Sequence, residues 1–190
     1  MGQGLLLIRH GALDDQGRRM IGCADISLND CGRAQMRNVC RHLVRRVCDL
    51  VCVVSSDLQR CQESARIIVR GVYEATGRTL PLHVDPRLRE LSLGAWEGLR
   101  RADIEKRWPG SYAMRGYDFA AFVPPGGESF RMLLRRVQSA YVHWRHMYPC
   151  GRLCFVTHAG VLRVLIAQHM ALPLGDVLRI PLTYAAFCEL

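Results

Sequence analysis

Hydrophobic positions along the chain follow two different periods. Runs in which every position is apolar have the length of a buried strand, and they fall at residues 5–8, 50–54 and 153–156. Between these runs, apolar positions recur every three or four residues, as they do on one face of a helix. Strands that alternate with helices in this way predict an α/β fold with a mostly parallel central sheet.

The helical pattern extends over four segments. We expect helices over about 27–46, 58–77, 128–148 and 161–170. Ser27 stands three residues before Asp30, which resembles a capping box at the start of the first helix. A short strand is expected at 82–84, and closing strands at 177–180 and 185–190. Helices on both faces of such a sheet predict a three-layer α/β/α sandwich.

Residues 87–127 have no regular period and hold aromatic side chains among glycines and prolines. We expect loops with short helices there, forming an irregular segment that covers the active site. Trp108, Tyr112 and Tyr117 are candidates for stacking on a substrate, although packing is the more frequent role of aromatic residues. The 190 residues slightly exceed the roughly 150 of a typical domain, so we expect 1–190 to form a single domain.

The chain is basic, with a formal net charge of +9 from 26 lysine and arginine residues, all but one of them arginine. An acidic partner or a compositional bias would each explain this charge. Arg33, Arg37, Arg41 and Arg45 would line one face of the first helix and could contact nucleic acid. Because the same helix has an apolar stripe on another face, we interpret the arginines as its solvated side. No known nucleic-acid-binding motif occurs, so we expect no nucleic-acid partner.

Membrane insertion and secretion are not expected. The longest apolar runs have five residues, far fewer than the ~20 needed to span a membrane. The first residues include no basic leader followed by a long apolar region. The nine cysteines form no Cys-x-x-Cys pair, so we expect reduced thiols and a cytoplasmic protein. His143, His146 and Cys150 are interpreted as ordinary helix residues rather than as metal ligands.

Chemically versatile residues follow three of the predicted strands. Arg9, His10 and Gly11 come after the first strand, residues 55–60 after the second, and residues 157–160 after the strand at 153–156. In open parallel sheets, ligands bind at the carboxyl ends of the strands. Glycines there let the backbone turn sharply and approach a ligand. The sequence therefore predicts an anion site with two histidines and two arginines at one edge of the sheet.

Several short motifs occur in the order typical of one family. They are Leu-Ile-Arg-His-Gly at 7–11; Gly22, Asp25, Leu28, Gly32 and Gln35; Ser-Ser-Asp-Leu-Gln-Arg at 55–60; Leu-Arg-Glu-Leu at 88–91; Gly-Ala-Trp-Glu-Gly at 94–98; Pro-Gly-Gly-Glu-Ser at 125–129; and Val-Thr-His-Ala-Gly at 156–160. Each motif alone is weak, but the ordered set is specific. The chain resembles the histidine phosphatase superfamily, also called phosphoglycerate mutase-like, over most of its length.

The resemblance implies that His10 is the nucleophile and takes up the phosphoryl group. Because an unperturbed imidazole has a pKa of ~6.5, a neutral ring nitrogen is available near pH 7. Arg9 and Arg60 nearby would favour that neutral form. Arg9, Arg60 and His158 would bind the phosphate oxygens, a task that suits planar guanidinium groups.

The resemblance implies that Glu90 is the general acid that protonates the leaving oxygen, so His10, Glu90 and His158 make up the expected catalytic set. Glu97, seven residues further on, is interpreted instead as a turn or salt-bridge residue. The sequence departs from the family after residue 11, where Ala12 and Leu13 replace the usual Glu and Thr or Ser. Gln16 stands where the family has an asparagine and is expected to contact phosphate in its place.

The resemblance thus implies a phosphatase that hydrolyses a small phosphomonoester through a phosphohistidine, without a metal or cofactor. The first loop and the 88–98 segment look most like the α-ribazole-phosphate phosphatase branch, which serves cobalamin biosynthesis. A phosphoglycerate mutase-type phosphotransferase, a non-catalytic phosphate-binding module and a broad-specificity sugar or nucleotide phosphatase are the alternatives. The expected ligand is a small phosphorylated metabolite, and a homodimer is left open.

Overall fold

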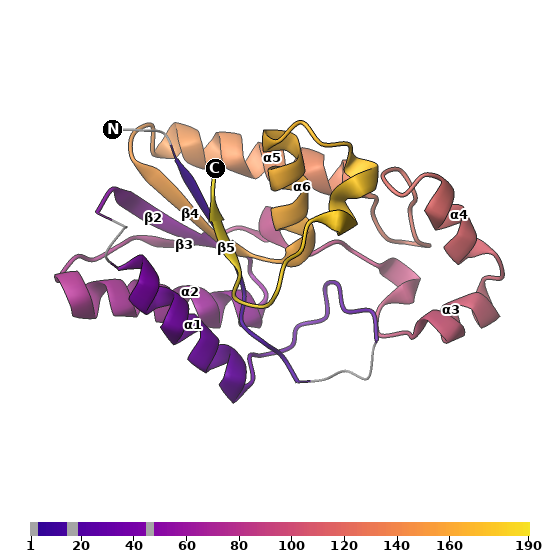
Figure 1. Cartoon of the computed structure of the whole chain (residues 1–190), viewed down its shortest axis with the longest axis horizontal. Helices are drawn as coiled ribbons and strands as arrows, with labels where there is room; N and C mark the ends of the chain where they lie inside the picture. The colour runs from indigo at the N-terminus through magenta and orange to yellow at the C-terminus, as the bar shows by residue number, and fades with distance from the viewer. Residues whose placement is uncertain (1–3, 15–18, 45–47) are drawn as a thin grey trace.

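A five-stranded sheet forms the centre of the computed structural model, which describes residues 4–14, 19–44 and 48–190 (Figure 1). Its strands are β1 (Leu5–Arg9), β2 (Leu50–Ser55), β3 (Leu82–Val84), β4 (Arg152–Thr157) and β5 (Phe187–Glu189). They lie in the order β3-β2-β4-β1-β5. The first four are parallel, and β5 runs antiparallel to β1. The predicted α/β fold with a mostly parallel sheet is confirmed.

Helices cover both faces of this sheet. Helices α1 (Asp30–Leu43) and α2 (Gln59–Thr76) pack on one face, and α5 (Phe130–Met147) and α6 (Ala159–His169) pack on the other (Figure 1). The three layers follow from the period of two in the strands. In β1, Leu6 and Ile8 belong to the core with α1 and α2, whereas Leu5 and Leu7 belong to the core with α5 and α6.

The segment at 177–180 is not the predicted strand. It lies in a 3₁₀ helix, η3 (Leu174–Arg179), that begins after Pro173. Only Val177 of this helix is buried, and Arg179 pairs with Asp176 one turn earlier, at 3.2 Å. A short apolar run is ambiguous between helix and strand, and here proline and the exposed positions around Val177 favour a turn. The other predicted closing strand contains β5.

The first helix begins at Asp30, and its cap differs from the prediction. The side chain of Asn29 accepts a hydrogen bond from the N–H of Gly32 at 2.7 Å. The Ser27 hydroxyl instead donates to Oε1 of Gln59 at 2.8 Å. Asparagine is as good an N-cap as serine, so the residue next to the helix provides the cap.

Short helices occupy much of 87–127, namely η1 (Pro86–Leu88), η2 (Gly94–Trp96), α3 (Arg101–Arg107) and α4 (Ser111–Tyr117). Trp96 is buried, and its ring stacks on Tyr112 with centroids 5.8 Å apart. Tyr112 is therefore engaged in packing within this segment, while Tyr117 is exposed. In the part of the chain that the structure describes, no helix is both long and apolar enough to cross a membrane. The single domain over 1–190 stays a prediction.

Candidate active site

The parallel strands bring three chemically important loops to one edge of the sheet. Arg9 at the end of β1 pairs in register with Thr157 of β4, and Ser55 of β2 pairs with Val156 of β4. Backbone bonds continue this alignment past the strands, since the N–H of His10 donates to the carbonyl of Thr157 at 3.0 Å. The residues that follow β1, β2 and β4 consequently share one site.

Three of the predicted site residues are in direct contact. The rings of His10 and His158 lie edge to face with centroids 5.2 Å apart. Arg60, in the first turn of α2, donates from Nε to Nδ1 of His158 at 3.2 Å. All three side chains are buried, with 4%, 0% and 1% of the surface of His10, His158 and Arg60 exposed.

The hydrogen bond of His10 defines its tautomer. Nδ1 of His10 lies 2.8 Å from the carbonyl oxygen of Gly11. A carbonyl oxygen only accepts hydrogen bonds, so Nδ1 carries the proton and Nε2 carries the lone pair. The ring is held with an unprotonated nitrogen on the side away from the Gly11 carbonyl.

His10 is also held in its neutral form. Burial, followed by the positive charges of Arg60 and Arg9, lowers the pKa of His10 to about 3. The sequence predicted the effect of the two arginines, but burial is the larger cause. At neutral pH, therefore, Nε2 of His10 is unprotonated, and such a nitrogen can attack an electrophile without a separate base.

Both ring nitrogens of His158 have protein partners. Because Nδ1 accepts from Arg60, Nε2 carries the proton and donates to Oγ of Ser56 at 2.9 Å. The Cys61 sulfur lies 3.3 Å from the same Nε2. Burial, then the proximity of His10 and Arg60, holds the pKa of His158 well below its usual value. His158 is thus a neutral ring that orients Arg60.

Arg60 is held by the chain segment 22–24 as well as by His158. Nη1 donates to the carbonyl of Ala24 at 2.6 Å, and Nη2 donates to that of Gly22 at 2.7 Å. A guanidinium has five N–H donors, and these bonds together with the one to His158 use three of them. The remaining two have no acceptor among the described residues and are placed where they could bind an anion.

Arg9 likewise has guanidinium N–H groups that are not used in bonds to the described residues. Nη1 donates to the carbonyl of Leu182 at 2.7 Å, and the guanidinium lies 4.2 Å from the centre of the Tyr184 ring. Nε of Arg9 is buried and has no acceptor among the described residues. A buried donor without a partner is costly, so this nitrogen favours an anion beside it.

Glu90 lies at the N-terminus of α6, the helix that begins directly after His158. The N–H of Gly160 donates to both carboxylate oxygens of Glu90 at 3.1 Å, and the N–H of Leu91 donates to Oε1 at 2.8 Å. A Cβ on residue 160 would overlap Glu90 Oε1, and one on Gly11 would overlap the backbone of Gly32. The two glycines therefore admit close protein neighbours, and neither has a positive φ. That they let the backbone approach a ligand stays a prediction.

Glu97 does not join this group of side chains. It accepts hydrogen bonds from the N–H groups of Gly22, Cys23 and Ala24 at 2.8, 3.1 and 3.2 Å. Two of these residues, Gly22 and Ala24, hold Arg60 through their carbonyls. The interpretation of Glu97 as a turn-binding residue agrees with this arrangement.

Ser56, Cys61 and Tyr184 also lie at the site and are not among the residues predicted from the sequence. Ser56 and Cys61 lie in or next to the motif at 55–60 that contains Arg60, so their proximity to the site was available from the sequence. Tyr184, whose ring centroid is 5.6 Å from that of His10, comes from the distant C-terminal segment. Its position in the sequence gave no local signal, because tertiary bonds bring it there: β5 pairs with β1, and the N–H of Ala185 donates to the carbonyl of His10 at 3.0 Å. Gln16 lies outside the described residues.

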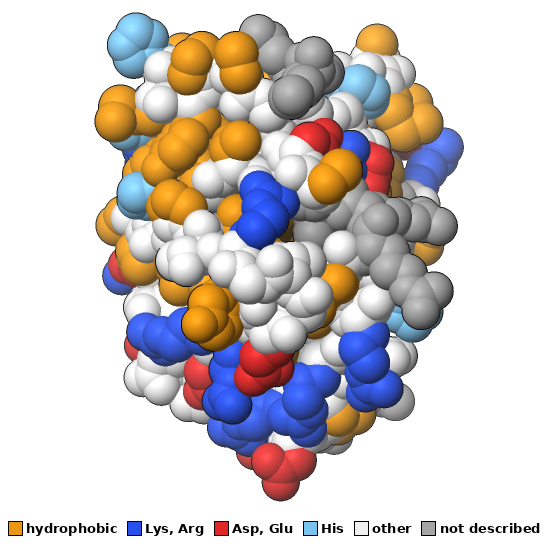
Figure 2. Space-filling model, turned by 90° about the vertical axis from the view of Figure 1, so that its left-hand side faces the viewer, with side chains coloured by type: hydrophobic (Ala, Val, Ile, Leu, Met, Phe, Trp, Pro, Cys, Tyr) orange, Lys and Arg blue, Asp and Glu red, His pale blue; other side chains and the backbone are white. Residues whose placement is uncertain are grey.

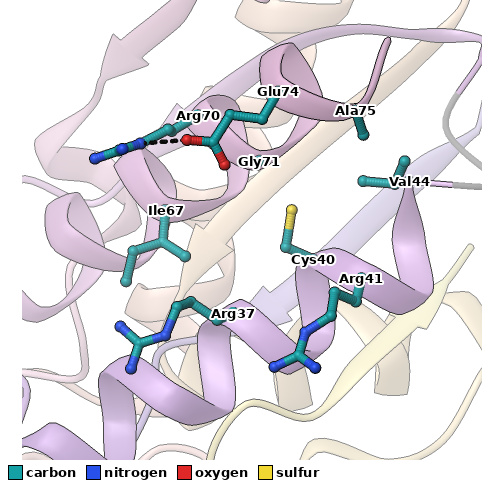
Figure 3. A pocket seen from close by; sticks show the side chains of 9 residues that line it. All are labelled: Arg37, Cys40, Arg41, Val44, Ile67, Arg70, Gly71, Glu74 and Ala75. Atoms are coloured by element: carbon teal, nitrogen blue, oxygen red, sulfur yellow. Dashed lines mark hydrogen bonds and ion pairs between the residues drawn. The ribbon is translucent and has the colours of Figure 1, made fainter.

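A separate groove runs between α1 and α2 (Figure 3). Its volume is about 770 Å³, and it is lined by Arg37, Cys40, Arg41, Val44, Ile67, Arg70, Gly71, Glu74 and Ala75. None of these is a predicted site residue. Figure 2 shows basic side chains gathered at the end of the molecule where α1 and α2 lie.

The described residues contain no group of three or more histidine, cysteine, aspartate or glutamate side chains arranged to hold a metal ion. Arg9 and Arg60 are two fixed positive charges of the site, and they suit the binding of an anion. That the reaction needs no metal stays a prediction.

Comparison with known proteins gives concordant results. Residues 5–190 match the family model of the histidine phosphatase superfamily (branch 1). The adenosylcobalamin/alpha-ribazole phosphatase of Salmonella typhimurium is 31% identical over 174 residues, which cover 91% of this chain and 82% of that protein. The glucosyl-3-phosphoglycerate phosphatase of Mycobacterium tuberculosis is 34% identical over 181 residues, covering 90% of this chain and 77% of that protein.

Solved structures share the same fold. A putative alpha-ribazole-5'-P phosphatase from Escherichia coli superposes with a TM-score of 0.84 at 25% identity, covering 100% of this chain and 90% of that one. The mycobacterial glucosyl-3-phosphoglycerate phosphatase solved with VO3 gives a TM-score of 0.81 at 30% identity, covering 99% and 90%.

Proposed function

The chain belongs to the histidine phosphatase superfamily, and from this premise we propose that it hydrolyses a small phosphomonoester through a phosphohistidine at His10. The observation that carries the proposal is the state of the His10 ring. Its Nδ1 proton is bonded to Gly11, and its pKa is lowered to about 3, so Nε2 is unprotonated at neutral pH. Such a nitrogen attacks phosphorus without a base.

Arg9 and Arg60 bind the phosphate in this proposal. Each has guanidinium N–H groups that the described residues leave unused, and both charges act on the buried His10. Fixed guanidinium groups stabilise the equatorial oxygens in the transition state and replace a metal ion there. We include Gln16 and His158 as further phosphate ligands. For His158, the Nε2 proton that is bonded to Ser56 Oγ would be donated to a phosphate oxygen instead.

The reaction proceeds in two displacements. The Nε2 lone pair of His10 forms a bond to phosphorus, the bond from phosphorus to the ester oxygen breaks, and Glu90 gives that oxygen a proton. Water then attacks the phosphorus, the bond from nitrogen to phosphorus breaks, and Nε2 regains its lone pair. Glu90 accepts the proton that the water releases. The site is thus returned to its starting state with inorganic phosphate as product.

For the substrate we propose α-ribazole 5'-phosphate, with the protein serving cobalamin biosynthesis. The motifs of 88–98 and the Salmonella typhimurium relative support this choice. A second candidate is glucosyl-3-phosphoglycerate, since the relative from Mycobacterium tuberculosis acts on it by name. Both are phosphomonoesters of small polar molecules and thus belong to the expected ligand class, small phosphorylated metabolites. We place the reaction in the cytoplasm, consistent with nine cysteines that are all free thiols.

The proposal is tested by hydrolysis of p-nitrophenyl phosphate in chelator, with the wild type and His10→Ala. We expect activity in the wild type and its loss in His10→Ala. α-Ribazole 5'-phosphate and glucosyl-3-phosphoglycerate are then compared by kcat/KM, with product analysis to detect transfer to a second hydroxyl. Equal activity in both proteins would overturn the role of His10, and an isomerised product would establish the mutase instead.

A further inference from the structure

The segment 22–24 connects Arg60, Glu90 and Glu97. Its carbonyls at Gly22 and Ala24 accept from Arg60, and its N–H groups donate to Glu97. The thiol of Cys23 donates to the backbone carbonyl of Glu90 at 3.2 Å. A three-residue segment thus contacts both the proposed phosphate ligand and the chain at the proposed acid.

The peptide unit between Gly22 and Cys23 is bonded on both sides. Its oxygen accepts from Arg60 Nη2 at 2.7 Å, and its N–H donates to Glu97 Oε2 at 3.1 Å. A cation on the oxygen and an anion on the N–H polarise the peptide in the same direction, so each bond strengthens the other. The carboxylate therefore fixes the carbonyl that orients the guanidinium.

Close packing leaves the segment little room to move. A Cβ on Gly22 would overlap the Leu91 carbonyl and lie 2.8 Å from Glu97 Oε2. Burial, and then the charge of Glu97, raises the pKa of the Cys23 thiol, so the thiol keeps the proton that it donates to Glu90. Glu97 is thus one of the groups that fix the segment, and it is the one that bonds to all three of its N–H groups.

We propose that Glu97 is a positioning residue that acts through 22–24 to hold Arg60 in its phosphate-binding orientation. The proposal rests on the proposed function, in which Arg60 binds the phosphoryl group. Glu97 accepts three backbone bonds, and removing it frees the two carbonyls that anchor Nη1 and Nη2. Misplacing a binding group by about 1 Å costs roughly 100-fold in rate.

The first experiment measures kcat and KM for p-nitrophenyl phosphate, and inhibition by inorganic phosphate, in Glu97→Ala and Glu97→Gln. We expect kcat/KM to fall about 100-fold in Glu97→Ala, with weaker inhibition by phosphate. Glu97→Gln keeps one acceptor oxygen and is expected to lose less; it also serves if Glu97→Ala does not fold. Wild-type KM and phosphate inhibition in both variants would contradict the proposal.

A double-mutant cycle separates action through Arg60 from a general structural role. In the background Arg60→Lys, the guanidinium that the Gly22 and Ala24 carbonyls orient is absent, so Glu97→Ala should then change kcat/KM by less than about threefold. A full additional loss in that background would show that Glu97 does not act through Arg60.

Val72→Ala is the control for lost stability. Val72 is buried on the same helix as Arg60, twelve residues and about 18 Å further along. We expect it to lower the unfolding midpoint without weakening phosphate inhibition; an equal weakening would overturn the proposal. If the wild type hydrolyses no phosphate ester, the proposed function fails by itself. Equilibrium binding of inorganic phosphate to the same variants then tests the coupling between Glu97 and Arg60.

Discussion

Nε of Arg60 donates a hydrogen bond to Nδ1 of His158 over 3.2 Å. This bond requires an unprotonated Nδ1, so it forms only while His158 is neutral. In turn, the charge of Arg60 helps to keep the pKa of His158 well below its usual value. The two side chains thus fix each other, one in orientation and the other in protonation state, beside the proposed nucleophile.

Arg60→Lys should reduce activity strongly. A lysine ammonium is a single point of charge and cannot reach His158, Gly22 and Ala24 together as the guanidinium does. We expect kcat/KM for p-nitrophenyl phosphate to fall about 100-fold or more. The matched control is Arg70→Lys, at an exposed arginine of α2 that pairs with Glu74 at 2.6 Å. Equal activities of the two variants would contradict the role of Arg60.

Glu90→Gln should have an effect that depends on the leaving group. An oxygen that leaves readily as an anion needs little protonation, whereas an alkyl oxygen needs a proton from the acid. We therefore expect a small loss of kcat with p-nitrophenyl phosphate and a loss of about 100-fold or more with an alkyl phosphate. The measurement is kcat across a series of esters. A loss of the same size for every ester would refute the assignment of Glu90 as the acid.

The sequence was sufficient for the parts of the site that follow strands. Parallel strands end at a common edge, so topology alone predicted that His10, Arg60 and His158 meet. Their hydrogen bonds depend on tertiary contacts. The periodicity of hydrophobic positions therefore could not predict the partners of His158. The same limit explains Tyr184, which reaches the site because the C-terminal segment bonds to the end of β1.

Two local errors have a related cause. The run at 177–180 and the serine at position 27 both carried plausible local signals, for a strand and for a cap. In the structure, Pro173 starts a 3₁₀ turn in the first case, and Asn29 is closer to the helix in the second. In both cases the local pattern correctly predicted a regular element. Neighbouring residues decided that the first is a 3₁₀ helix and where the second begins.

Gly160→Ala tests the space that Glu90 occupies. The added Cβ would overlap Glu90 Oε1, so the carboxylate must move away from α6. We expect the pattern of Glu90→Gln, with a larger loss of kcat for alkyl than for aryl phosphates. Gly116→Ala in α4 is the control, because among the described residues no atom beyond its own stretch of helix lies within 4 Å of the added Cβ. An unchanged leaving-group dependence in Gly160→Ala would contradict the proposed placement of Glu90.

The buried histidines should make the fold sensitive to acid. The pKa of His10 is about 3 in the folded chain against 6.5 for an ordinary histidine, so below pH 6.5 the unfolded chain binds a proton that the folded chain does not. The contribution of neutral His10 to the free energy of unfolding is fully present above pH 6.5 and is lost as the pH falls from 6.5 toward 3. For His10 alone, the free energy of unfolding should decrease by about 2 kcal/mol between pH 7.5 and 5.

Urea unfolding at these two pH values checks this expectation. His10→Gln should show a smaller loss of stability between pH 7.5 and 5 than the wild type. His169→Gln, which removes an exposed histidine, should keep the wild-type difference. If His10→Gln and the wild type lose the same stability, His10 is not held neutral by the fold.

The most direct test of the account is to trap the phosphorylated enzyme. A turnover reaction is quenched in alkali, where phosphohistidine persists, and the digested protein is analysed by mass spectrometry. We expect one added phosphoryl group, located on His10, that acid removes and that is absent from His10→Ala. A phosphoryl group on another residue would contradict the role of His10. The same conclusion would follow if the wild type showed no trapped intermediate and His10→Ala kept full activity.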